Sequence, residues 1–109
     1  MIPRSLRADP RRIAAARPQV IRLPWVIARY VQEPGPGALA VVVSKKSAKL
    51  AVSRHLAKRR VAAAFLQVLP KGHAVSLTLT PLGAAARGET LRTWCAELAA
   101  RILDTTHVH

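Results

Sequence analysis

Hydrophobic and polar residues follow two different periods along the chain, and these periods separate the expected strands from the expected helices. In residues 73–80, large apolar side chains alternate with small or polar ones, which predicts a half-buried strand. Residues 39–43 are a continuous apolar run, which is typical of a strand covered on both faces. A further strand is expected over residues 20–31, where β-branched and aromatic residues are frequent and Pro24 indicates an edge or a strand start.

Other segments have the signals of helices. Asp9 followed by Pro10 is a helix start, because Asp caps free amides and Pro suits the first helical position. The short helix that begins there is expected to end before Pro18. Residues 48–68 and 90–103 carry apolar residues at helical spacing, which predicts a long central helix and an amphipathic last helix.

The long central helix has two apolar stripes. The first stripe is expected to be buried and consists of Leu50, Ala57, Val61, Ala64 and Phe65. A second, weaker stripe is unexpected on a solvated face and consists of Val52, Leu56 and Ala63. It could contact another protein or simply a longer tail.

The order of these elements predicts the fold class. A Pro-Gly-Pro-Gly turn at residues 34–37 is expected to return the chain antiparallel. The resulting order αββαβα predicts an α+β fold of two layers, with a single sheet and helices packed on it. The chain has 109 residues, the size of one domain. We assign residues 1–104 to this domain and expect residues 105–109 to be a frayed tail.

The charge of the chain indicates the kind of partner that it binds. The chain has 18 Lys and Arg against 5 Asp and Glu, a net charge of +13, and 50% of its residues are hydrophobic. Such a composition is that of a folded basic domain rather than a disordered basic tail. No acidic residue lies between Glu33 and Glu89, and most basic residues of that stretch lie between Ser44 and Val61. Massed charge without intervening carboxylates indicates a binding site for a polyanion.

The joint between the apolar run 39–43 and the long helix is the strongest candidate within this basic stretch. The sequence there is Val43-Ser44-Lys45-Lys46, with Lys49 three residues further on. A helix N-terminus has free amides and a partial positive charge, so lysines beside it favour phosphate binding.

Other chemistry finds little support in the sequence. A single cysteine, Cys95, excludes an intramolecular disulfide framework, and the five carboxylates are scattered. His107 and His109 resemble a metal-binding pair but are expected to be unstructured, so neither a metal site nor a catalytic set is predicted. No apolar run is long enough to span a membrane, and residues 1–17 do not resemble a secretory signal. We therefore expect a cytoplasmic protein.

Several motifs together resemble the protein subunit of bacterial ribonuclease P. They are Val43-Ser44-Lys45-Lys46 at the end of a strand, then Arg54, Lys58-Arg59 and Ala64-Phe65 along the long helix, and Pro3-Arg4 with Leu6-Arg7 near the start. Several positions differ from the family pattern, among them Ala62-Ala63, which replace an Arg-Glu pair. His55 and Leu56 replace the last two residues of its Arg-Asn-Arg element, and Ala28 stands where an aromatic residue is frequent. In the first helix, Ile13 and alanines replace the usual aromatics, which predicts weaker stacking on RNA.

The resemblance implies a fold and a set of contacts. The fold would contain a left-handed β-α-β crossover, as in the second domain of ribosomal protein S5. RNA-binding residues would be Lys45, Lys46, Lys49, Arg54, His55, Lys58, Arg59 and Arg60. A groove for the 5′ leader of precursor tRNA would be lined by Arg4, Arg7, Ile13, Val26, Ala28 and Tyr30.

The resemblance also implies a function. The chain would be the accessory subunit of a ribonucleoprotein endoribonuclease that removes the 5′ leader of precursor tRNA, with the catalytic centre in the RNA. Mg²⁺ would be held mainly by that RNA, and the protein would be monomeric without it. Two alternatives remain open. One is a ribosomal or ribosome-assembly protein that binds RNA without supporting cleavage, and the other is a protein of anionic membrane surfaces.

Overall fold

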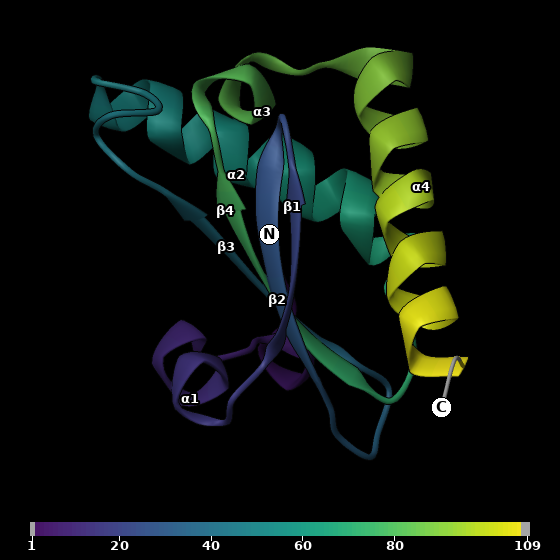
Figure 1. Ribbon diagram of the computed structural model, residues 1–109. Helices are drawn as coiled ribbons and strands as arrows, with labels where there is room; N and C mark the ends of the chain where they lie inside the picture. The colour runs from purple at the N-terminus through teal and green to yellow at the C-terminus, as the bar shows by residue number, and fades with distance from the viewer. Residues whose placement is uncertain (1, 108–109) are drawn as a thin grey trace.

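Four strands form one mixed sheet in the computed structural model, which describes residues 2–107 (Figure 1). Along the sheet the strands follow the order β1-β2-β4-β3; the β3–β4 pair is parallel, and the other neighbours are antiparallel. The α+β prediction with a single sheet is therefore confirmed. The elements are a 3₁₀ turn η1 (Arg4–Leu6), α1 (Pro10–Ala15), β1 (Gln19–Leu23), β2 (Val26–Gln32), β3 (Ala38–Val43), α2 (Ala51–Leu66), β4 (His73–Leu79), α3 (Pro81–Ala85) and α4 (Gly88–His107).

The strand expected over residues 20–31 is in fact a hairpin of two strands. The chain turns at Pro24 and Trp25, and Leu23 pairs with Val26 across the turn. The Trp25 ring is buried there and stacks on Trp94 of α4, with 5.6 Å between the ring centroids. Strand propensity is equally high on both sides of this turn, so propensity alone did not reveal the break. The predicted order αββαβα lacks this strand and the short helix α3.

The turn at residues 34–37 reverses the chain as expected, but it does not place β3 beside β2. Strand β4 lies between them, because β2 pairs with β4 on one side and β3 pairs with β4 on the other. Gly35 and Gly37 have φ angles of 127° and 99°, which only glycine adopts easily. Since β3 and β4 are parallel, the chain needs the long crossover that α2 supplies.

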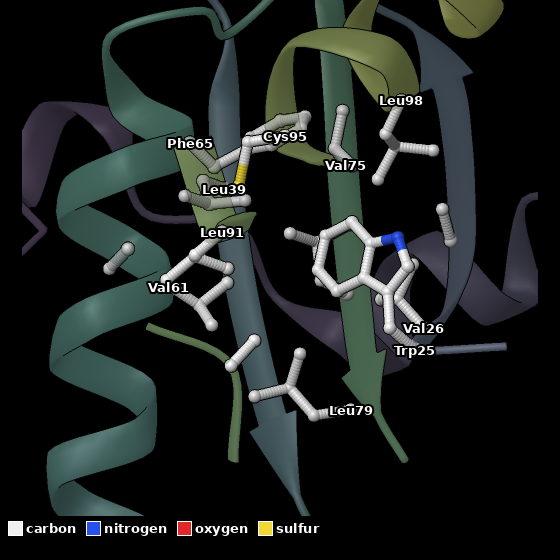
Figure 2. Close-up of a cluster of buried hydrophobic side chains, with 14 of the residues drawn as sticks. Trp25, Val26, Leu39, Val61, Phe65, Val75, Leu79, Leu91, Cys95 and Leu98 are labelled. Atoms are coloured by element: carbon white, nitrogen blue, oxygen red, sulfur yellow. The ribbon is translucent and has the colours of Figure 1, made fainter. Parts of the chain in front are cut away.

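Helices α2 and α4 cover one face of the sheet and enclose the main core (Figure 2). From β3 and β4, the alternate residues that point to this face include Leu39, Val75 and Leu77, all fully buried. The α2 residues Val61 and Phe65 are buried in the same cluster. The helix α4 contributes Leu91, Cys95, Leu98 and Ile102.

The apolar stripes of α2 behave differently from each other. Ala57, Val61 and Phe65 of the first stripe are buried as expected, whereas Leu50 is 69% exposed. Leu50 lies outside because α2 begins only at Ala51, so the residue does not follow the helical period. The residues of the second stripe, Val52, Leu56 and Ala63, are all exposed to solvent.

Strand β4 is buried on both faces, which corrects the prediction of a half-buried strand. Ala74 and Ser76, on the face turned away from the main core, are only 2% and 3% exposed. A central strand has neighbours on both sides, and its small side chains are covered by theirs. Helix α1 adds to this cover, because Ile13 packs toward this second face and is 3% exposed.

Helix boundaries also differ from the prediction. The N-terminus of α1 is as expected, since the Asp9 side chain accepts from the Arg11 N–H (3.0 Å). Helix α4 continues to His107, which places residues 105–107 of the expected tail within the helix. The rest of that expected tail, residues 108–109, lies outside the described residues, as do the side chains of Thr106 and His107.

Candidate nucleic-acid interface

A compact turn carries the chain from the end of β3 toward α2. The Ser47 backbone N–H donates to the Ser44 carbonyl (3.1 Å), and the Ser47 hydroxyl donates to the Leu79 carbonyl at the end of β4 (2.7 Å). The turn is thereby held against the sheet although its outer side chains are exposed. This arrangement positions the basic segment without any partner.

The lysines of this turn do not lie at the helix N-terminus that their spacing suggested. Lys45 and Lys46 are exposed in the turn, and α2 begins only at Ala51, after Leu50 in an extended conformation. The polar Ser44–Ser47 turn takes the place of the first helical turn that was expected there. Phosphate at Lys45 and Lys46 would therefore be bound by side-chain charge rather than by the amides of α2.

Arg54 holds the end of this turn in place. Its Nη1 group donates to the carbonyls of Ala48 (3.1 Å) and Lys49 (2.8 Å). These two carbonyls precede the first turn of α2, where side-chain caps are absent. Arg54 is thus partly a structural residue, because it fixes the segment that carries Lys49.

One side of α2 faces a hollow at the edge of the sheet, which we call the edge hollow. It has a volume of about 400 Å³ and lies between α2, the edge strand β3 and the N-terminal segment. His55, Lys58 and Arg59 border it from α2, and Arg7 borders it from the N-terminal segment. Its remaining lining is apolar and consists of Ile2, Ala8, Pro10, Leu39, Ala40, Val41 and Ala62.

The other side of α2 faces a second hollow, the α3 hollow, of about 330 Å³. Lys49, Arg60 and Arg87 lie around it. Arg60 also has a structural contact, since its Nη2 group donates to the Ala84 carbonyl of α3 (2.9 Å). The basic residues predicted to bind RNA therefore do not form one patch, because Lys49 and Arg60 lie across α2 from Lys58 and Arg59.

The predicted leader groove was wrong at three residues. Val26, Ala28 and Tyr30 are at most 3% exposed, because they point into the core beneath α2 and α4. Alternation along β2 places the intervening residues on the opposite face, among them Ile27 and Arg29. Sequence reasoning missed this phase, although the small residues of β4 were a signal of it. In the register, Ile27 pairs with Thr78 and Arg29 with Ser76.

A third hollow lies between α1 and this second face of the sheet, and we call it the α1 hollow. It has a volume of about 350 Å³ and is bordered by Ile13, Arg7 and Arg12. Ile13 and Arg7 were both predicted to line the leader groove. Arg4 is exposed in η1 and does not border this hollow. Further along the second face, Arg29 donates from Nη1 to the Thr78 hydroxyl (3.5 Å).

Almost none of the positive charge is neutralised within the described part of the chain. The ion pair recorded there joins Arg12 to Glu33 across 3.3 Å, and its side chains are 78% and 41% exposed. Exposed pairs of this kind contribute little to stability. The cations along α2 have no carboxylate partner among the described residues, which leaves their charge for an external anion.

The chain has a single cysteine, and its possible metal ligands are its carboxylates, its histidines and this thiol. Burial raises the pKa of the Cys95 thiol to about 11, which makes this thiol inert near neutral pH. Among the side chains that the structure describes, no cluster of three or more His, Cys, Asp or Glu could hold a metal ion. Over the same residues, no helix has the length and apolar character needed to cross a membrane.

Comparisons with known proteins agree with this architecture. The model of the ribonuclease P family matches residues 7–102. A solved Staphylococcus aureus RNase P protein, a mutant with defective mRNA degradation activity, has 15% identity and a TM-score of 0.73, with 92% of this chain and 89% of that chain covered. The RNase P protein from Thermotoga maritima has 17% identity and a TM-score of 0.58, with 91% and 93% covered. No curated protein sequence matches the chain.

Proposed function

Because this chain belongs to the ribonuclease P family, we propose that it is the protein subunit of a ribonucleoprotein that removes the 5′ leader of precursor tRNA. In this proposal an RNA subunit carries the catalytic centre, and the protein binds that RNA and the leader. One observation carries the proposal: the basic side chains around α2 have no carboxylate partner among the described residues. Such a surface suits a phosphate backbone.

The RNA subunit would contact the exposed turn and the side of α2 that borders the edge hollow. Lys45, Lys46, Lys58 and Arg59 are exposed there and would pair with phosphates. Lys49 and Arg60 would reach RNA only if it also wraps the side of α2 near α3. Arg54 would act mainly by positioning the turn, since its Nη1 group already binds two carbonyls.

The leader would follow the second face of the sheet beside α1. The α1 hollow offers an apolar wall at Ile13 and the cation of Arg7. Arg12 at its border is paired with Glu33, and Asp9 also lines it. Arg29 extends this positive charge along β2. None of the described residues that line the α1 hollow is aromatic. Contacts to the leader would thus be mainly electrostatic rather than by base stacking.

Mg²⁺ would be held by the RNA partner. In support of this assignment, the described residues contain no group of three or more His, Cys, Asp or Glu side chains that could hold a metal ion without the RNA. The protein's contribution would be to neutralise phosphate charge and thereby reduce the Mg²⁺ concentration that the RNA needs.

Reconstitution with the ribonuclease P RNA of the same organism tests this proposal. Cleavage of precursor tRNA would be measured at low millimolar Mg²⁺ with and without the protein. A clear stimulation that disappears at high Mg²⁺ is expected. Tight RNA binding without stimulation would instead favour a ribosomal or ribosome-assembly role. Absence of RNA binding at low salt would contradict both.

A further inference from the structure

The edge hollow has an apolar interior and a charged rim, and it lies beside β3, the edge strand of the sheet. Leu39, Val41 and Ala62 contribute to its interior, while Lys58 and Arg59 stand at its border. Its volume of about 400 Å³ falls within the range of small-ligand pockets. A ligand that fills it would need an apolar or planar part and an anionic part.

Backbone groups of β3 add hydrogen-bonding capacity to this interior. The Leu39 carbonyl points away from the sheet, because it accepts from the Ala8 N–H of the N-terminal segment (3.0 Å). Alternate residues of a strand direct their backbone groups to the same side, so the N–H and carbonyl of Val41 also point outward. The N-terminal segment pairs with β3 only at Leu39 and does not reach Val41. The described residues therefore leave one donor and one acceptor of Val41 without a partner at the hollow.

Side chains at the charged rim also lack partners among the described residues. No hydrogen bond or ion pair is recorded there for the side chains of His55, Lys58 or Arg59. Arg7 uses its Nε group to donate to the Ile2 carbonyl (3.0 Å), which orients its guanidinium beside the hollow. Cations at the mouth and a donor–acceptor pair at the wall therefore occur together.

We infer that the edge hollow accepts one unpaired nucleotide of the bound RNA. The base would insert against Leu39 and Ala62, and its Watson–Crick edge would pair with the backbone N–H and carbonyl of Val41. The adjoining phosphates would contact Lys58 and Arg59. Every base has a donor beside an acceptor on that edge, so Val41 alone would not select one base. This inference rests on the proposed function, because it assigns a specific contact to the same RNA partner.

Substitutions that fill the hollow without changing charge provide the test. Ala62→Leu narrows it from α2, and Ala8→Leu narrows it from the N-terminal segment, away from the main core. Ala63→Leu is the matched control, since Ala63 is exposed on the same helix and does not line the hollow. Thermal unfolding of each variant would establish that the fold is kept.

Affinity for the RNA subunit would be measured over a range of KCl concentrations. Loss of two hydrogen bonds should weaken binding about tenfold for both filling variants. The slope of log affinity against log salt should stay unchanged, because every cation that pairs with a phosphate remains in place. Ala63→Leu should bind like the unmodified protein. Equal affinity of all three variants would overturn the inserted nucleotide while leaving RNA binding, and with it the proposed function, intact.

Nuclear magnetic resonance with AMP as a probe provides a second readout. The Val41 amide signal should shift on addition of millimolar AMP, and inorganic phosphate should shift signals near Lys58 and Arg59 without moving Val41. A Val41 amide that AMP does not move would contradict insertion of the base. Failure of the unmodified protein to bind its RNA at all would instead remove the proposed function.

Discussion

The two faces of the sheet are built from alternate residues of the same strands, yet they have opposite roles. On one face, Ala28 and Leu77 are fully buried beneath α2 and α4. On the other face, Arg29 and Thr78 occupy the neighbouring positions and remain half-buried. Among the described helices, α1 covers part of that second face. A shift of one residue along β2 therefore separates a structural position from one that can bind a ligand.

The difference between the two faces of the sheet predicts where a substitution should affect folding and where it should affect binding. Side chains beneath α2 and α4 stabilise the domain through burial of apolar surface. The cations on the outer side of α2 and on the second face form no ion pair among the described residues, apart from the pair of Arg12 with Glu33. Substitution of those that make no structural hydrogen bond, such as Lys58 and Arg59, should leave the fold largely unchanged.

The largest expected effect is on the covered face. Leu77→Ala should reduce the free energy of unfolding by about 3 kcal/mol, because Leu77 is fully buried in the central strand and its truncation leaves a cavity. Thr78→Ala, its neighbour on the second face, should reduce it by less than about 1 kcal/mol. Urea unfolding followed by circular dichroism measures both values. Equal losses would show that the second face is also a structural core.

The next effect concerns RNA binding on the outer side of α2. Replacing Lys58 and Arg59 together by Ala should weaken RNA-subunit binding and reduce the salt slope by about 0.9 for each phosphate that is no longer neutralised. A matched control replaces Arg92 and Arg101, two exposed cations of α4, by Ala. This control removes the same charge far from the edge hollow. Identical losses of affinity in the two double variants would mean that net charge alone drives binding.

A smaller effect is expected from Arg29→Ala on the second face. Removal of one cation should weaken binding of leader-bearing precursor tRNA severalfold, roughly the value of one charge-assisted hydrogen bond. Binding of mature tRNA should not change, because the leader is absent. Thr78→Ala removes the hydroxyl that Arg29 contacts and controls for that hydrogen bond. If mature tRNA loses as much affinity as precursor tRNA, the leader does not follow this face.

The smallest effect concerns Cys95 beneath α4. The raised pKa, about 11 against 9.0 for a free thiol, means that the folded protein disfavours the thiolate. Its contribution to stability should be constant below pH 9 and should decline as the pH rises from 9 to about 11. Cys95→Ser should remove this decline. Alkylation by iodoacetamide at neutral pH should require unfolding, and rapid labelling of the folded protein would contradict burial of the thiol.

Much of the fold could be predicted from local patterns. The Asp9-Pro10 helix start and the apolar run of β3 depend on neighbouring residues alone. The hairpin turn at Pro24 and Trp25 could not be predicted in this way. Its stability comes from contacts distant in sequence, including the stacking of Trp25 on Trp94 and the bond from the Thr80 N–H to the Trp25 carbonyl.

The candidate site was predictable in composition but not in arrangement. The basic stretch from Lys45 to Arg60 is visible in the sequence because charge needs no partner to be recognised. Which side of α2 each residue occupies depends on where that helix begins, and the Ser44–Ser47 turn delays its start to Ala51. The β2 residues Val26, Ala28 and Tyr30 were assigned to the leader groove for a different reason. Both faces of this strand carry apolar residues, so the sequence did not show which face is buried.

By itself, the sequence determined the α+β class, the main helices and the concentration of positive charge, since these follow from periodicity and composition. The tertiary structure alone decided that β4 lies between β2 and β3 and that Val26, Ala28 and Tyr30 face the core. It also places the outer backbone edge of Val41, which no described residue pairs with, beside Lys58 and Arg59. Those features depend on pairing between distant segments. The alternation of side chains within a single strand does not predict which face of that strand the helices will cover.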